Sequence, residues 1–455
     1  MASESLCQIN RAKVRLLRQQ EEEAFAIRTK GSARLAARAK AHLPGSVPMA
    51  WMRGLYRTPP LYVTYGKGAR FYDVDGNSYL DFNVADLSMT MGFGPKPIVE
   101  AVSRQIADGS QFLLANEDSI QVAEELAERN GLPFWQFTLS ASGANTEVIR
   151  IARFVTKRKK IIIFEGHYHG HIEETLVKRQ DDQVVPGLLG LPHDAGANTI
   201  ILPFNDLDAV EAALKPEDVA LIITEPALTN CNVILPKHDY LEGLRRLTIQ
   251  YGTLLCFDEA HSYQFAYGGL VRDWELECDF HVLGKGLGTG ISFALYGMTS
   301  EIGEIVDRHL DIDVGPAGLA TGGTTYASAM AVAAAKAALF HVLTPEKYQC
   351  VQRLGKRLSK GLERVFADYS LPWTAFHLGP RSGYCMDLAL PVDFKQAKLS
   401  LDYEMIDARR VFMANRDHWD AVASAGPQAS FAHHEDDVDA YLSVAEDFVA
   451  ALVSR

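Results

Sequence analysis

Two short segments of the sequence place an acid and a lysine where they could hold a reactive cofactor. Residues 255–261 read as an apolar strand that ends in Asp258, and residues 283–288 place Lys285 among glycines. The separation of the two residues fits one strand–loop–strand step, so we expect them on neighbouring strand ends. A lysine amine can hold an aldehyde as a Schiff base, and a buried acid can keep a pyridine nitrogen protonated so that the ring takes up electrons. The pair therefore predicts a pyridoxal phosphate enzyme.

The setting of Lys285 favours this interpretation over a plain surface lysine. It follows a predicted buried strand, and glycines on both sides leave room for a bulky adduct. A lysine withdrawn from water offers a reactive neutral amine more readily. Residues 258–261, Asp-Glu-Ala-His, also match a helicase-type nucleotide hydrolase, which needs an upstream Gly-x4-Gly-Lys-Ser/Thr loop. No Gly-Lys pair in the chain has that spacing, so the sequence disfavours this alternative.

Length and composition limit the remaining possibilities. A chain of 455 residues predicts two domains, and 47% apolar with 22% charged residues is typical of a globular protein. The net charge of −12 argues against a nucleic-acid partner. Six scattered cysteines form no CxxC pair and no zinc spacing, which favours a reducing cytoplasm. The polar N-terminus lacks a signal peptide pattern, and no apolar run is long enough for a membrane span.

The spacing of apolar residues predicts the helices and strands that position Asp258 and Lys285. Residues 5–42 predict helix, and residues 61–83 predict a small antiparallel unit with turns at Gly-Lys-Gly and Asp-Gly-Asn. Predicted helices at 96–109, 118–130, 146–156, 207–214 and 241–251 alternate with apolar strands at 134–139, 160–164, 199–202, 220–224, 254–257 and 280–283. Continuous apolar strands between helices predict a largely parallel sheet covered on both faces. Residues 329–343 predict a further helix, followed by a mixed region.

Polar segments follow several predicted strands, at the edge where a parallel sheet binds its ligand. Residues 140–145 lead into a helix, whose N–H groups could hold a phosphate or simply be capped by serine. Residues 165–171 contain three histidines, but we expect no metal, because a short loop rarely aims three rings at one ion. An aromatic side chain there could instead stack on a flat cofactor. Glu225 ends another strand at the same edge.

Together these segments resemble the class III aminotransferases, and most of all the branch that contains glutamate-1-semialdehyde aminomutase. The similarity runs along most of the chain, from about residue 44 to about residue 445. It is carried, in family order and spacing, by residues 72–82, 167–170, 225–226, 257–259, 283–285 and 323–324, and by Pro44-Gly45 followed by Arg53.

The resemblance implies roles for these residues. Lys285 would form the Schiff base and then move the substrate proton, Asp258 would pair with the pyridine nitrogen, and Glu225 would lie near the ring hydroxyl or the substrate amine. Cofactor binding would also involve Ser142, Gly143 and Ala144 at the phosphate, Tyr168 stacked on the ring, His261 in the lining, and Thr324, which would reach the phosphate of the neighbouring subunit in a homodimer.

Arg53 is our candidate for binding an acid group of the substrate, because a guanidinium forks onto a carboxylate or phosphonate. Arg416 and Arg381 are the alternatives. The chain also departs from the family pattern around the cofactor. Where the family usually has Ser-Gly-Thr-Glu-Ala, residues 142–146 read Ser-Gly-Ala-Asn-Thr, which loses an acid and a hydroxyl, and Ala260 replaces a valine that usually packs on the ring. These departures affect the expected reaction more than the expected cofactor.

The sequence therefore predicts an α/β fold-type-I pyridoxal phosphate enzyme with a mostly parallel, seven-stranded type of sheet. Residues 1–83 would form an N-terminal helix and hairpin belonging to a small domain, residues 84–335 the large cofactor-binding domain, and residues 336–455 the rest of the small domain. The predicted function is an aminotransferase acting between an amino acid or amine and a 2-oxo acid. The alternatives are an ammonia-lyase acting on a hydroxylated aminophosphonate or a phosphorylated amino alcohol, and an intramolecular aminomutase.

Overall fold

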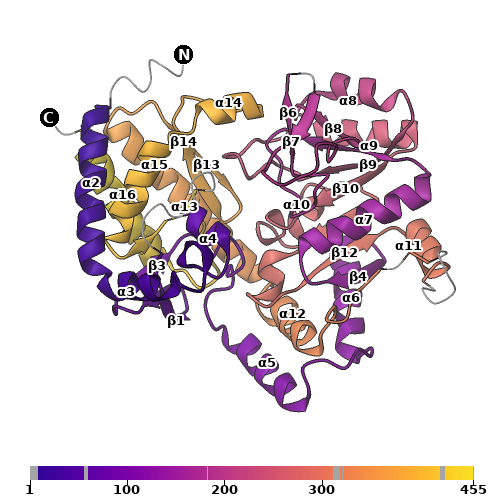
Figure 1. The fold of residues 1–455 in the computed structure, drawn as a ribbon, viewed down its shortest axis with the longest axis horizontal. Helices are drawn as coiled ribbons and strands as arrows, with labels where there is room; N and C mark the ends of the chain where they lie inside the picture. Colours follow the sequence, from indigo (N-terminus) through magenta and orange to yellow (C-terminus); the bar gives the residue numbers. More distant parts are fainter. Residues whose placement is uncertain are drawn as a thin grey trace. The chain divides into compact units, whose positions relative to one another are not determined.

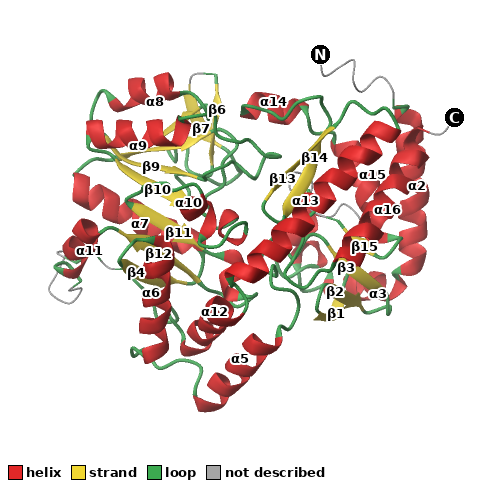
Figure 2. Cartoon of the chain, turned by 180° about the vertical axis from the view of Figure 1, so that it is seen from behind, coloured by secondary structure: helices red, strands yellow, loops and turns green. Residues whose placement is uncertain are grey.

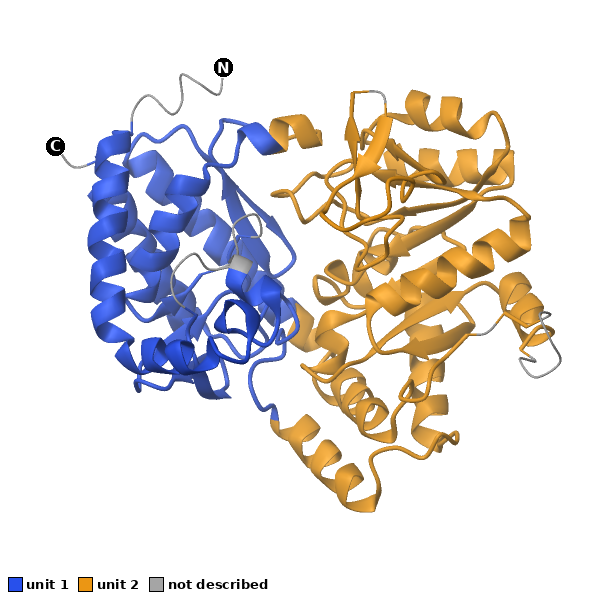
Figure 3. Ribbon diagram, in the orientation of Figure 1, with its two compact units in different colours: residues 1–95, 349–390, 398–455 blue, residues 96–348, 391–397 orange. Residues whose placement is uncertain are grey.

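The computed structural model describes residues 9–55, 60–181, 183–310, 318–319, 321–420 and 426–453. It divides into two compact units, coloured separately in Figure 3. Unit 1 comprises residues 1–95, 349–390 and 398–455, and unit 2 comprises residues 96–348 and 391–397. Unit 1 thus draws on both ends of the chain. The domain boundaries expected after residues 83 and 335 remain predictions.

Unit 2 is built on a seven-stranded sheet with the order β4-β12-β11-β10-β9-β5-β8 (Figure 1). The strands are β4 (Phe134–Thr138), β5 (Lys160–Phe164), β8 (Thr199–Leu202), β9 (Val219–Thr224), β10 (Leu254–Asp258), β11 (Phe280–Leu283) and β12 (Ala294–Met298). Strands β8, β5, β9, β10 and β11 pair in parallel, and β12 runs antiparallel to both β11 and β4. The prediction of a mostly parallel sheet is confirmed, although β12 was not predicted.

Helices surround this sheet because its strands are apolar on both faces; every residue of β9, for example, is buried. They are α5 (Lys96–Asp108), α6 (Glu117–Asn130), α7 (Ala141–Thr156), α8 (Leu207–Leu214), α9 (Tyr240–Tyr251), η3 (Ser262–Gln264), α10 (Gly269–Asp273), η4 (Lys285–Gly288), α11 (Ser300–Asp307) and α12 (Ala329–His341). Helix α7 contacts β4, β9, β10, β11 and β12, so it lies across the centre of the sheet. A short antiparallel pair, β6 (Val177–Gln180) and β7 (Gln183–Pro186), was not predicted.

Helix α7 begins five residues earlier than the predicted start at residue 146. The side chain of Ser140 caps it by accepting a hydrogen bond from the N–H of Gly143. Ser142 and Gly143 have little helix preference of their own, and the cap and tertiary packing place them in the helix. The first turn therefore lies at the carboxyl edge of the sheet.

Unit 1 contains a four-stranded sheet, a β-hairpin and several long helices (Figure 2). The sheet has the order β1 (Val63–Lys67), β2 (Arg70–Asp73), β3 (Ser78–Asp81), β15 (His418–Trp419), and the hairpin joins β13 (Thr374–Leu378) to β14 (Arg381–Cys385). The helices are α2 (Arg11–Arg28), α3 (Lys30–Ala39), η2 (Pro44–Ser46), α4 (Ala50–Leu55), α13 (Pro345–Asp368), which begins in unit 2, α14 (Phe394–Leu399), at the boundary between the units, α15 (Tyr403–Ala414) and α16 (Glu435–Val453).

The single helix predicted for residues 5–42 is two helices, separated at Thr29. Thr29 leaves helical geometry at φ −117° and ψ 41°, and its hydroxyl donates to the carbonyl of Phe25. Residues 5–8 of the predicted helix lie outside the described residues. None of the helices in the described ranges is long and apolar enough to cross a bilayer.

Candidate active site

The carboxyl ends of three adjacent parallel strands carry the predicted catalytic residues. In the sheet register Thr224 of β9 pairs with Phe257 of β10, so the next residues, Glu225 and Asp258, lie at neighbouring strand ends. Val282 of β11 pairs with Asp258, and Lys285 follows three residues later. The structure therefore brings Glu225, Asp258 and Lys285 to one edge of the sheet in unit 2, where ligands of parallel sheets bind.

Asp258 is a buried carboxylate, 3% exposed, that accepts three hydrogen bonds. Asn145 Nδ2 donates to Oδ2 at 2.7 Å, and His169 Nδ1 donates to the same oxygen at 2.9 Å. The N–H of Ala260 donates to Oδ1 at 3.0 Å. A carboxylate offers about four lone-pair positions, so Asp258 retains capacity for one more donor, such as a protonated ring nitrogen.

Lys285 opens the short helix η4 with φ 45°, in the left-handed region that non-glycine residues rarely adopt. Strain of this kind concentrates at functional sites. The glycine before Lys285 is closely packed, since a Cβ at Gly284 would lie 3.3 Å from the Cβ of Ala141. Lys285 is thus held on a tight turn that passes directly beside the start of α7.

The predicted phosphate cradle lies at the N-terminus of α7. The N–H groups of Gly143 and Ala144 donate to the side chain and the carbonyl of Ser140, respectively. The hydroxyl of Ser142 accepts from the N–H of His171, which ties the start of α7 to the loop after β5. The hydroxyl of Tyr326 faces the cradle, because a Cβ at Gly143 would lie 3.2 Å from it. A bound phosphate would replace the Ser140 side chain as partner of the Gly143 N–H, while the Ala144 N–H keeps its hydrogen bond within the helix.

The imidazole rings of the histidine-rich loop after β5 make different contacts. Both nitrogens of His167 face carbonyl oxygens, those of Phe164 and Thr175, and burial lowers the pKa of His167 to about 4. His169 binds Asp258, as described above. Tyr168, expected to stack on the cofactor ring, is 43% exposed. No cluster of three His, Cys, Asp or Glu residues suited to a metal occurs within the described ranges.

Glu225 is the second buried acid of the site, at 2% exposed. Its carboxyl group contacts the hydroxyl of Thr229, and that hydroxyl also lies 2.7 Å from Nδ1 of His261. Burial raises the pKa of Glu225 to about 7, and the negative charge of Asp258 adds to this, while the hydrogen bond from Thr229 opposes it. His261, predicted only as part of the lining, therefore contacts the acid network through Thr229.

Thr324 lies on the loop that leads into α12 and is exposed. Its carbonyl accepts a hydrogen bond from Gln111 Nε2 at 2.8 Å, and the N–H of Gly322 donates to Glu147 of α7 at 2.7 Å. These contacts hold the loop to unit 2. The structure contains one chain, so the predicted contact of Thr324 with the cofactor phosphate of a neighbouring subunit remains a prediction.

The three arginines considered for the substrate's acid group all lie in unit 1. Arg53 lies on α4, where its stem packs over Gly45. Arg416 donates to Glu21 at 3.0 Å and to the carbonyl of Phe412. Arg381 on β14 is 1% exposed. Their role toward a substrate stays a prediction.

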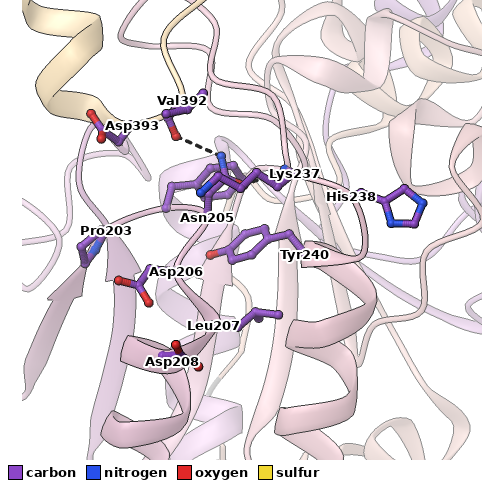
Figure 4. A pocket seen from close by; sticks show the side chains of 11 residues that line it. Pro203, Asn205, Asp206, Leu207, Asp208, Lys237, His238, Tyr240, Val392 and Asp393 are labelled. Carbon is purple, nitrogen blue, oxygen red and sulfur yellow. Dashed lines mark hydrogen bonds between the residues drawn. The ribbon is translucent and has the colours of Figure 1, made fainter.

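A separate cavity of about 440 Å³ lies in unit 2 beside the edge strand β8 (Figure 4). It is formed at the starts of α8 and α9 and includes Asn205, Asp206, Lys237 and Tyr240. Asn205 Nδ2 donates to the carbonyl of Val392 at 3.0 Å across it, the dashed line in Figure 4. None of the predicted site residues lines this cavity, so it is distinct from the strand-end site.

Sequence reasoning missed two functional contacts. Asn145 was noted only as a departure from the family, and Thr229 was not considered, yet they bind the two buried acids of the site. A signal existed for Asn145, a polar residue on the otherwise apolar face of α7 that packs on the sheet. Thr229 lies in an irregular segment after β9 and offered no periodic signal.

Comparisons with known proteins agree with this geometry. Residues 53–373 match the model of the family described as aminotransferase class-III. The chain is 33% identical to a glutamate-1-semialdehyde 2,1-aminomutase of Persephonella marina over 402 residues, 85% of this chain and 91% of that protein. It is also 33% identical to glutamate-1-semialdehyde 2,1-aminomutase 2 of Geobacillus kaustophilus, over 90% of this chain and 96% of that protein.

Solved structures show the same relationship. A glutamate-1-semialdehyde-aminomutase from Pseudomonas aeruginosa PAO1 matches with a TM-score of 0.93 at 30% identity, covering 98% of this chain and 99% of that one, and a lysine-to-alanine variant of it was solved with PMP. A beta-phenylalanine aminotransferase from Variovorax paradoxus matches in fold, with a TM-score of 0.85 at 23% identity over 96% and 97% of the two chains. The predicted fold-type-I architecture and the resemblance to the aminomutase branch are confirmed.

Proposed function

The chain belongs to the class III aminotransferase family, and from this premise we propose that the protein moves an amino group between an amino acid or amine and a 2-oxo acid. Pyridoxal phosphate is the cofactor of this family, and when bound it supplies an aldehyde that captures amines and a ring that takes up electrons. The observation that carries the proposal is the pairing of a buried, hydrogen-bonded Asp258 with Lys285 on the adjacent strand end.

The residues present fit this cofactor. Asp258 has capacity for one more donor, which suits a protonated pyridine nitrogen. The first turn of α7, residues 142–144, would hold the phosphate, in part through the N–H of Gly143, and Tyr168 offers an exposed aromatic face. Together these contacts would fix the orientation of the cofactor ring. The hydrogen bond to Asp258 would keep the pyridine nitrogen protonated.

Lys285 would act as the acid–base group of the reaction. A primary amine on a tight glycine-flanked turn can hold the cofactor and, once displaced by the incoming amine, take a proton from the amine-bearing carbon of the substrate. The strained backbone at Lys285 supports a functional role, because strain persists only where the surrounding structure enforces it. Glu225, buried at the neighbouring strand end, would lie near the ring hydroxyl or the substrate amine.

An intramolecular aminomutase reaction is the second candidate. It is favoured by the relatives that are 33% identical over most of the chain, which are glutamate-1-semialdehyde 2,1-aminomutases. The two candidates differ in co-substrate, since an aminotransferase needs a separate oxo acid and an aminomutase does not. The changed residues around the cofactor, Asn145 and His261 among them, are where such a difference would arise.

A half-reaction screen separates these outcomes. The cofactor-loaded protein is mixed with single amines, and pyridoxamine phosphate, rearranged substrate and ammonia are each quantified. Pyridoxamine phosphate with release of an oxo product supports the aminotransferase. Isomerisation of one substrate without an oxo acid supports the aminomutase, and ammonia with the cofactor unchanged would show elimination and overturn both.

We also propose that the protein acts as a homodimer with Thr324 at the shared sites. Phe112, Leu113 and Leu114 form an apolar segment exposed by 51%, 69% and 79%. Gln111, the residue before this segment, donates to the carbonyl of Thr324, so the two features are adjacent in unit 2. Contiguous exposed apolar side chains mark interaction sites. Analytical ultracentrifugation of Leu113→Asp checks this, since a variant that stays dimeric and fully active would contradict it.

A further inference from the structure

Thr229 joins the carboxyl group of Glu225 to the imidazole of His261. Its hydroxyl contacts Glu225 Oε2 and lies 2.7 Å from His261 Nδ1, whereas Oε2 and Nδ1 are 3.7 Å apart. The N–H of Thr229 also approaches Glu225 Oε1 at 3.4 Å. Glu225 and Thr229 are each 2% exposed, and His261 is 9% exposed. The hydroxyl is therefore the shortest link between the acid and the ring.

Hydrogen counting allows two arrangements of this link, because a hydroxyl has one hydrogen. When Glu225 is protonated, its O–H donates to Thr229, and Thr229 donates to Nδ1 of His261. When Glu225 is ionised, Thr229 donates to the carboxylate and accepts from the N–H at Nδ1 of His261. Both arrangements satisfy all three groups, so the protonation of Glu225 and the tautomer of His261 change together.

The surroundings of the two acids decide which one carries the proton. Asp258 accepts from Asn145, His169 and a main-chain N–H, while the hydrogen bonds to Glu225 come from Thr229 alone within the described residues. Neighbouring buried carboxylates cannot both ionise without a large cost. Glu225, the acid with fewer hydrogen-bond donors, is therefore the better site for a proton.

The charged and titratable groups that face Glu225 come from three elements. His169 is on the loop after β5, Asp258 is at the end of β10, and His261 follows it. His169 is committed to Asp258, which leaves the Thr229–His261 link as the adjustable contact of Glu225. The opposing effects of burial and of the Thr229 hydrogen bond on the pKa of Glu225 agree with this geometry.

We propose that Thr229 and His261 are positioning residues that couple the protonation of Glu225, the acid next to Asp258 and the cofactor ring, to the tautomer of His261, with the Thr229 hydroxyl stabilising the Glu225 carboxylate once its proton is lost. This rests on the proposed function only in placing the ring beside Asp258. The proton on Glu225 is released as the pH rises, the Thr229 hydroxyl turns to the carboxylate, and Nδ1 of His261 becomes a donor.

The test is an infrared pH titration of the full-length protein, with and without pyridoxal phosphate, following the carbonyl band of a buried protonated acid. Subtracting the spectra of Glu225→Gln isolates the band of Glu225. Thr229→Val removes the hydroxyl that stabilises the carboxylate and should move the midpoint upward by about one pH unit, a tenfold change. Thr229→Ser keeps the hydroxyl and should restore the wild-type midpoint.

His261 is tested by a double-mutant cycle. His261→Asn should shift the midpoint in the wild-type background and add no further shift in Thr229→Val, because the ring acts through the hydroxyl. Equal shifts in both backgrounds, an unchanged midpoint in Thr229→Val, or no acid band attributable to Glu225 would each overturn the proposal. The titration without cofactor does not depend on any reaction, so its failure is distinguishable from failure of the proposed function.

Discussion

The buried acid Glu225 should make the stability of the protein depend on pH in a predictable direction. Burial raises the pKa of Glu225 from 4.5 to about 7 in the folded state. The folded chain then keeps a proton that the unfolded chain has already released. The stabilisation by Glu225 is complete below pH 4.5 and is lost as the pH rises through about 7. At about 1.4 kcal/mol per pKa unit, the loss between about pH 5 and about pH 8 is about 2.5 kcal/mol.

Glu225→Gln removes this titration while keeping a similar shape. The difference in unfolding free energy between wild type and Glu225→Gln should therefore change by about 2.5 kcal/mol over that interval, with wild type losing stability at the higher pH. Urea unfolding of the cofactor-free protein, followed by circular dichroism at a series of pH values, measures it.

A second measurement tests the same linkage without any assumption about the number of unfolding steps. At about pH 6, unfolding of wild type should release about one more proton than unfolding of Glu225→Gln, measured by potentiometry. Asp81 is a matched control in unit 1, because burial raises its pKa to about 7 as well. Asp81→Asn should leave the difference between wild type and Glu225→Gln unchanged. Equal pH dependence in the two proteins, or a loss of stability at low pH specific to Glu225, would refute the reasoning.

Three further substitutions test the site. Asp258→Asn should still bind pyridoxal phosphate but lose turnover on the order of a hundredfold or more, because the charge opposite the ring nitrogen is gone; near-normal rates would show that Asp258 is not its partner. Asn145→Ala removes a donor to Asp258 and should weaken cofactor affinity measured by fluorescence titration, and an unchanged affinity would contradict its role. Gly284→Ala places a Cβ 3.3 Å from that of Ala141 and should destabilise the fold by about 1–3 kcal/mol, whereas a neutral result in urea unfolding would show that the turn can relax.

The parallel core of the fold was predictable because its strands are short apolar runs between turn signals. The predicted ranges 160–164, 199–202 and 280–283 coincide with β5, β8 and β11. Strand β12 was not predictable in this way, because Ala294 and Gly297 give it little strand preference and its pairing with β4 joins distant parts of the chain.

The residues of the site also fall into a predictable group and a group that could not be predicted. Asp258 and Lys285 were predicted because each follows an apolar strand, and strand ends of a parallel sheet meet at one edge. The hydrogen bond of Asn145 to Asp258 joins residues 113 positions apart, and the link from Glu225 to His261 depends on an irregular segment. Such contacts follow from packing, which periodicity does not encode. The run of left-handed residues from Val84 to Leu87 was likewise not predicted, since Asp86 alone among them is of a type that enters this region with any frequency.

The central claim is that Lys285 is the residue that holds the cofactor. The most direct measurement is reduction of the pyridoxal phosphate-loaded protein with borohydride, followed by proteolysis and mass spectrometry. The account predicts a pyridoxyl group on Lys285 at near-stoichiometric yield, and none in Lys285→Ala, which should also lack the visible absorbance of covalently held cofactor. A stoichiometric pyridoxyl group on another lysine, or normal absorbance in Lys285→Ala, would contradict the account.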